Sequence, residues 1–107
     1  MRLTLEEKNG IILAIAPFLE GHKAELRLYG SRVIDSLKGG DIDLLLLTEG
    51  AEIASKLTSN KHYLLSAIKK NLGDQKIDLL ISSNKLLEQA SFLQLIYPGS
   101  LILKQWG

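Results

Sequence analysis

The residues that most constrain the fold form the segment 40–47, which reads GDIDLLLL. Residues 42–47 are nearly all apolar, too few for a typical helix, and bounded by Gly40 and Gly50, so they predict a buried central strand. Two carboxylates, Asp41 and Asp43, stand at the head of this strand. Burying an ionised carboxylate costs several kcal/mol unless a cation or hydrogen bonds compensate its charge. Both aspartates therefore require a compensating partner.

The N-terminal third predicts a helix, a strand and a second, shorter helix. Apolar residues at helical spacing indicate a helix over about residues 5–20, and Thr4 followed three residues later by Glu7 is the capping-box pattern at its start. Alternating apolar residues then predict a short strand that ends at Tyr29. The second helix is expected from about Ser31 to just before residue 39.

The rest of the chain continues the alternation of helices and strands. Residues 51–72 fit two helices or one broken helix, and residues 76–82 (KIDLLIS) repeat the form of the first buried strand. A last helix is expected from about Ser83 or Asn84 to residue 96, and the apolar residues 101–103 leave open a final strand. This order predicts an α/β (α+β) fold, in which a small mixed β-sheet is flanked by helices.

Composition narrows the classes of partner. Thirteen Lys and Arg against twelve Asp and Glu give a net charge of +1, and aromatic residues make up only 6%, so neither RNA nor an anionic membrane is an expected partner. No apolar segment approaches the ~20 residues that span a bilayer. The chain has no cysteine and its first residues do not resemble a secretory signal, so we expect one cytoplasmic domain over residues 1–107.

The two aspartates suggest a metal site. Side chains alternate along a strand, so Asp41 and Asp43 are expected on one face with Cα atoms ~6.6 Å apart. Mg²⁺ prefers carboxylate oxygens and is commonly bound together with substrate phosphates. Gly30 and Ser31 can supply a phosphate cradle, because glycine lets the backbone approach a ligand closely and serine offers a hydroxyl and an N–H.

These motifs resemble a known signature. Residues 29–31 (Tyr-Gly-Ser), nine further residues, and then residues 41–44 (Asp-Ile-Asp-Leu) match the order hG-S-x9-D-h-D-h of the polymerase-β-like nucleotidyltransferases. The short chain is similar to the minimal branch of that superfamily, the MNT proteins, and so is its C-terminal segment FLQLIYPGSLILK. Asp78, in the second buried strand, occupies a position similar to that of the third carboxylate of the family.

The resemblance implies a polymerase-β-like nucleotidyltransferase fold and an Mg²⁺-dependent transfer of a nucleoside monophosphate, AMP from ATP, to an acceptor hydroxyl. It also implies a role for six residues. The three carboxylates would be catalytic and hold two Mg²⁺ ions, and the other three residues would bind the phosphates of the nucleotide. The carboxylates are Asp41, Asp43 and Asp78, and the phosphate-binding residues are Gly30, Ser31 and Arg32, whose guanidinium matches phosphate oxygens.

The acceptor and partner follow from the resemblance alone. Minimal members are often antitoxins that modify a partner toxin with a HEPN domain, so a hydroxyl on such a protein is the expected acceptor. The alternative is a non-catalytic MNT-like antitoxin that inhibits its partner by contact, which is favoured by an unusual loop, RVIDSLKG, after Ser31. Homo-oligomers and hetero-oligomers both remain open.

Overall fold

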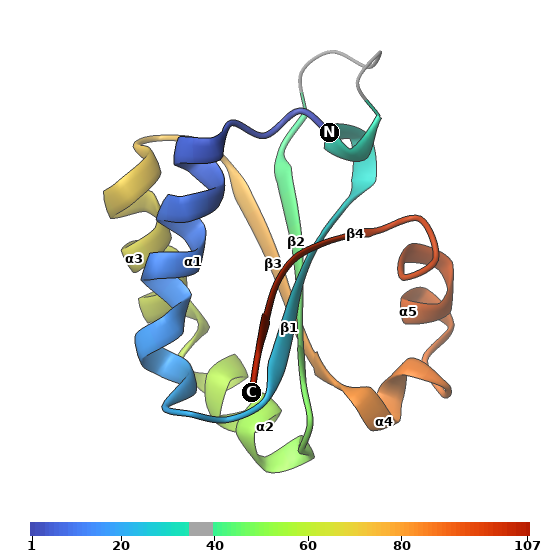
Figure 1. Ribbon diagram of the computed structural model, residues 1–107. Helices are drawn as coiled ribbons and strands as arrows, with labels where there is room; N and C mark the ends of the chain where they lie inside the picture. Colours follow the sequence, from blue (N-terminus) through green and yellow to red (C-terminus); the bar gives the residue numbers. More distant parts are fainter. Residues whose placement is uncertain (35–39) are drawn as a thin grey trace.

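A computed structural model describes residues 1–34 and 40–107, and Figure 1 shows helices on both sides of one sheet. Five α-helices, a short 3-10 helix (η1) and four strands follow one another along the described chain. In chain order they are α1 (Leu5–Leu19), β1 (Ala24–Tyr29), η1 (Gly30–Val33), β2 (Ile42–Thr48), α2 (Ala51–Ser59), α3 (Lys61–Leu72), β3 (Ile77–Ser83), α4 (Asn84–Leu87), α5 (Ser91–Ile96) and β4 (Leu101–Trp106).

The sheet is mixed, with the strand order β3-β2-β1-β4. Strand β1 runs antiparallel to both β2 and β4, whereas β2 and β3 are parallel. A parallel pair needs a long crossover, and α2 and α3 supply it. The predicted α+β fold with a small mixed sheet is therefore confirmed, including the final strand that the sequence left open. No helix in the described ranges has the length and apolar character of a bilayer-crossing segment.

Both faces of the central strand β2 are covered (Figure 1). Helices α1, α2 and α3 pack on one face over the larger core, which contains Leu44 and Leu46. Helices α4 and α5 cover the other face over a smaller core built around Leu45, Leu47 and Leu93. A strand buried on both sides needs apolar residues at every position, which explains the continuous leucine run.

Helix α1 begins and packs as its sequence predicts. The Thr4 hydroxyl accepts a hydrogen bond from the Glu7 N–H at 3.0 Å, and the Glu7 carboxylate accepts one from the Thr4 N–H at 2.9 Å. Gly10 lies where α1 crosses α3, and the Asn71 side chain donates a hydrogen bond of 2.9 Å to its carbonyl. A Cβ at Gly10 would stand 2.9 Å from Leu72 Cδ1, so glycine lets the two helices pack closely here without a shift of the Leu72 side chain.

Two expectations need correction. Among the described residues the second helix forms only the 3-10 turn Gly30–Val33, and its expected continuation beyond Ile34 falls within 35–39, outside the described residues. The expected last helix is two short helices, α4 and α5, separated by residues 88–90. At the break the Gln94 side chain donates a hydrogen bond to the Glu88 carbonyl, and the bend lets Leu87 and Leu93 reach the same small core.

The capping box gives a direct test of how much this local motif stabilises the fold. Thr4→Ala removes the hydroxyl that accepts the Glu7 N–H, so we expect the free energy of unfolding, measured by urea denaturation, to fall by about 1 kcal/mol. Thr4→Ser keeps the hydroxyl and should retain most of the stability. Equal losses in the two variants would show that the threonine methyl group, rather than the cap, matters.

Candidate functional site

The pairing of three strands brings the candidate carboxylates to one end of the sheet. Tyr29 of β1 lies opposite Asp43 of β2, and Asp43 lies opposite Asp78 of β3. Since side chains alternate, Asp43 shares the face of Leu45, the face covered by α4 and α5. Asp41 lies one residue before β2. The proximity of Asp43 and Asp78, which the sequence motifs only suggested, thus follows from the strand register.

The electrostatics around Asp43 indicate unbalanced negative charge. Partial burial, together with the charges of Asp78 and Asp41, raises the pKa of the Asp43 carboxyl. Burial and the charges of Asp43 and Asp78 likewise raise the pKa of the Tyr29 hydroxyl. In the described part of the chain, Asp41 has a cationic neighbour, the exposed Lys76 ammonium at 3.6 Å, and no ion pair reaches Asp43 or Asp78.

The predicted phosphate loop is packed directly against this carboxylate. Gly30 has φ +80°, a conformation that favours glycine, and a Cβ at this position would collide with the Asp43 carboxylate. Gly40 has φ +91°, and a Cβ there would collide with the Ser31 hydroxyl. Because these two glycines have no side chain, the backbone at Gly30 can lie close to Asp43, and the backbone at Gly40 can lie close to Ser31.

Two arginines hold the start of this loop. Arg32, a predicted phosphate contact, donates hydrogen bonds to the Arg2 carbonyl at 3.0 Å and the Gly40 carbonyl at 3.3 Å. The Arg2 backbone N–H donates to the Arg32 carbonyl at 2.7 Å, and the Arg2 guanidinium donates to the Ser31 carbonyl at 3.5 Å. The structure thus gives Arg32 a part in shaping the loop. Sequence reasoning missed Arg2, because no motif links it to Ser31.

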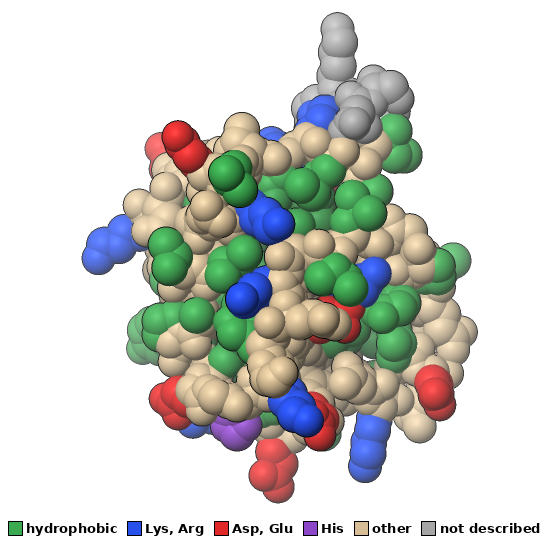
Figure 2. Space-filling view, in the orientation of Figure 1, with side chains coloured by type: hydrophobic (Ala, Val, Ile, Leu, Met, Phe, Trp, Pro, Cys, Tyr) green, Lys and Arg blue, Asp and Glu red, His purple; other side chains and the backbone are tan. Residues whose placement is uncertain are grey.

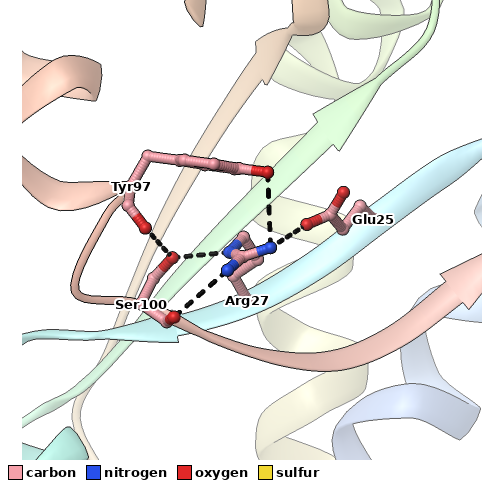
Figure 3. A network of polar contacts seen from close by, with 4 residues as sticks. All are labelled: Glu25, Arg27, Tyr97 and Ser100. Atoms are coloured by element: carbon pink, nitrogen blue, oxygen red, sulfur yellow. Dashed lines mark hydrogen bonds and ion pairs between the residues drawn. The ribbon is translucent and has the colours of Figure 1, made fainter.

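A second residue that sequence reasoning missed is Arg27, which is buried on β1 (Figure 3). Its guanidinium donates to the Ser100 hydroxyl at 2.5 Å and the Ser100 carbonyl at 3.1 Å, and it forms an ion pair with Glu25. Its guanidinium carbon also lies 4.3 Å from the centre of the Tyr97 ring. These contacts attach the turn after α5 to the sheet. The sequence offered one sign of this role: Glu25, Arg27 and Tyr29 occupy alternate positions and therefore lie on one face of the strand.

The candidate metal ligands of this site are carboxylate oxygens. In residues 1–34 and 40–107 no group of three or more His, Cys, Asp or Glu side chains is arranged so that it could hold a metal ion. Asp43 and Asp78 nevertheless lie side by side and carry oxygen donors suited to Mg²⁺. Because Mg²⁺ is usually held by one or two carboxylates together with substrate phosphates and water, this pair fits the ion's chemistry.

Comparison of the chain with protein-family models, with curated proteins and with solved structures finds no match. The candidate site is therefore defined by the chain's own geometry. Strand register joins Asp43 to Asp78 and Tyr29, and close backbone packing joins Gly30 to Asp43.

The contact between Gly30 and Asp43 can be tested against a matched glycine. Gly21 has φ +82° and no atom within 4 Å of the position that a Cβ would take, so Gly21→Ala should cost only the left-handed backbone penalty of about 1–2 kcal/mol. Gly30→Ala has the same penalty plus the collision with Asp43 and should lower the free energy of unfolding further, as measured by urea denaturation. Equal losses would contradict the close packing.

The raised pKa of Asp43 predicts the sign of a pH effect. A carboxyl whose pKa is raised in the folded state disfavours folding once it ionises, and the penalty disappears below the pKa of an aspartate in the unfolded chain, 3.8. Asp43→Asn should therefore be more stable than the wild-type protein at pH 7, and the difference in unfolding free energy should vanish as the pH falls toward 3.

The pKa of Glu7 is shifted in the opposite direction, so we expect the opposite effect of pH on stability. Burial raises its pKa, but hydrogen bonds from Thr4 and Gln75 outweigh burial and leave the pKa lowered. Its stabilising effect is present at neutral pH and is lost as the pH falls through the folded pKa. Glu7→Gln should therefore lower stability at pH 7.

A destabilising effect of Asp43→Asn at pH 7 would contradict the charge assignment around Asp43.

Proposed function

We propose that this chain is an Mg²⁺-dependent nucleotidyltransferase with the fold of the minimal branch of the polymerase-β-like superfamily. It would transfer AMP from ATP to an acceptor hydroxyl. The observation that carries the proposal is the register that sets Asp43 beside Asp78, with Gly30 packed on the Asp43 carboxylate. Carboxylates that hold a metal next to a glycine-containing loop would supply what phosphoryl transfer depends on, positioning and charge neutralisation.

The residues that would hold the metal are Asp41, Asp43 and Asp78. The raised pKa of Asp43 supports this assignment, because its cause includes the charges of two neighbouring carboxylates that a divalent cation would offset. Bound Mg²⁺ would neutralise the triphosphate and the developing charge at the reacting phosphorus. Asp41 would exchange its exposed contact with Lys76 for this role, a small loss since surface ion pairs contribute little.

The other residues position the nucleotide. Backbone N–H groups of Gly30 and Ser31, with the Ser31 hydroxyl, would bind the distal phosphates, and Arg32 would shape the loop and approach a phosphate oxygen. In the reaction the acceptor oxygen forms a bond to the α-phosphorus, and the bond from this phosphorus to the bridging oxygen of pyrophosphate breaks. Asp78, the most exposed of the three carboxylates, would receive the acceptor proton.

The acceptor we propose is a hydroxyl on a partner protein of the HEPN type, with this chain as the antitoxin. The visible face of the molecule carries positive and negative side chains interspersed (Figure 2), without the basic stripe that favours RNA. The net charge of +1 agrees with this choice.

A non-catalytic antitoxin that acts by contact alone is the second candidate. The observation that favours it is the lack, in the described part of the chain, of a ready-made group of three acidic side chains. In that case the carboxylates would be an inherited feature, and inhibition of the partner would persist without nucleotide.

The experiment combines radiolabelled ATP, Mg²⁺ and the protein encoded by the neighbouring gene. We expect label on that protein, a loss of at least ~100-fold in rate for Asp43→Asn and Asp78→Asn, and complete loss when EDTA removes Mg²⁺. Asp74→Asn is the matched control, because Asp74 lies in an exposed turn just before β3 and should leave the rate unchanged.

Inhibition of the partner by the two aspartate variants separates the candidates. Inhibition undiminished in Asp43→Asn, with no label on the partner, would support the contact-only antitoxin. Label on RNA in place of protein would overturn the proposed acceptor while leaving the nucleotidyl transfer intact.

A further inference from the structure

A groove whose described lining residues carry no charge begins at Gly30, the glycine that packs against the Asp43 carboxylate. It has a volume of about 610 Å³, within the range of ~300–1,000 Å³ for small-molecule sites. Its walls come from the β1–η1 junction and from α5. The main lining residues are Tyr29, Gly30, Val33, Ile34, Phe92 and Leu95.

Several of the lining side chains are unusually exposed for their type. Ile34 is 51% exposed, Phe92 53% and Leu95 79%. Hydrophobic side chains are visible at the surface on the flank of the molecule where α5 lies (Figures 1 and 2). Apolar side chains gathered around a concavity favour a ligand site over scattered surface residues.

The groove and the carboxylate site share two residues. Gly30 lines the groove and also packs against the Asp43 carboxylate. Tyr29 lines the groove and is the register partner of Asp43. A ligand with its phosphates at Gly30 and the carboxylates would therefore have its other end at the mouth of the groove.

The chemistry of the walls selects an uncharged aromatic group. Tyr29 and Phe92 form an edge-to-face pair with ring centres 6.4 Å apart, and none of the lining residues within 1–34 and 40–107 carries a charge. Aromatic side chains next to a phosphate site can stack on the face of a base without hydrogen bonds to the donors and acceptors on its edge. A second anionic group or a nucleic-acid backbone would find no cation among the described lining residues.

We propose that this groove binds the nucleobase of the nucleoside triphosphate, which would stack on Phe92 while Tyr29 packs edge-to-face against the Phe92 ring. The proposal rests on the nucleotidyltransferase function proposed above and adds where the base lies and how it is recognised. The Arg27 contacts to Ser100 and Tyr97 hold the turn after α5 on the sheet and so keep this wall in place (Figure 3).

The test compares a complete nucleotide with its phosphates alone. Calorimetric titration with Mg²⁺ would measure affinity for an ATP analogue with a methylene bridge between the α and β phosphorus atoms, and for inorganic tripolyphosphate. Phe92→Ala should weaken binding of the analogue about tenfold and leave tripolyphosphate binding unchanged, because only the stacked base is lost. Phe92→Tyr should retain the wild-type affinity.

Tyr63→Ala is the matched control, because Tyr63 is 58% exposed, does not line the groove, and lies on α3, which packs on the opposite face of the sheet from α5. Unchanged affinity of Phe92→Ala for the analogue would overturn the proposal, as would an equal loss for both ligands. If wild-type protein binds neither ligand, the nucleotidyltransferase function itself fails, which is a different result from failure of the groove alone. Circular dichroism of each variant would establish that the fold is retained.

Discussion

The parallel pairing of β2 with β3 is the interaction on which the rest of the structure depends. It places a strand with two buried faces in the middle of the sheet, so that α1, α2 and α3 can pack on one side and α4 and α5 on the other. The same register sets Asp43 against Asp78. One set of backbone hydrogen bonds thereby determines both where the core lies and where the carboxylates meet.

Local charge repulsion is the consequence of that pairing. Carboxylates on adjacent strands are held closer than they would be in an unfolded chain, and part of the stability of the apolar core offsets their repulsion. Such an arrangement is typical of functional sites, where groups are held in positions that stability alone would not favour. In the function proposed above, a divalent cation would offset this repulsion, and phosphates would bind through that cation and through the backbone of Gly30 and Ser31.

Much of the fold was predictable because its signals are local. The capping box of Thr4 and Glu7, the leucine run of β2 and the repeated form of β3 each depend on residues close together in the chain. The break between α4 and α5 was not predictable, because helical periodicity continues through it. It arises where residues on both sides of the break must reach one small core.

The sequence by itself determined which residue types stand at the ends of β1, β2 and β3, because side-chain alternation and apolar runs are properties of consecutive residues. Only the tertiary structure decided that Asp43 faces Asp78, that Arg27 binds Ser100 seventy-three positions away, and that α5 forms a groove beside Gly30. The physical reason is that register and packing between distant segments follow from the combined fit of the whole core, which no short stretch of sequence contains.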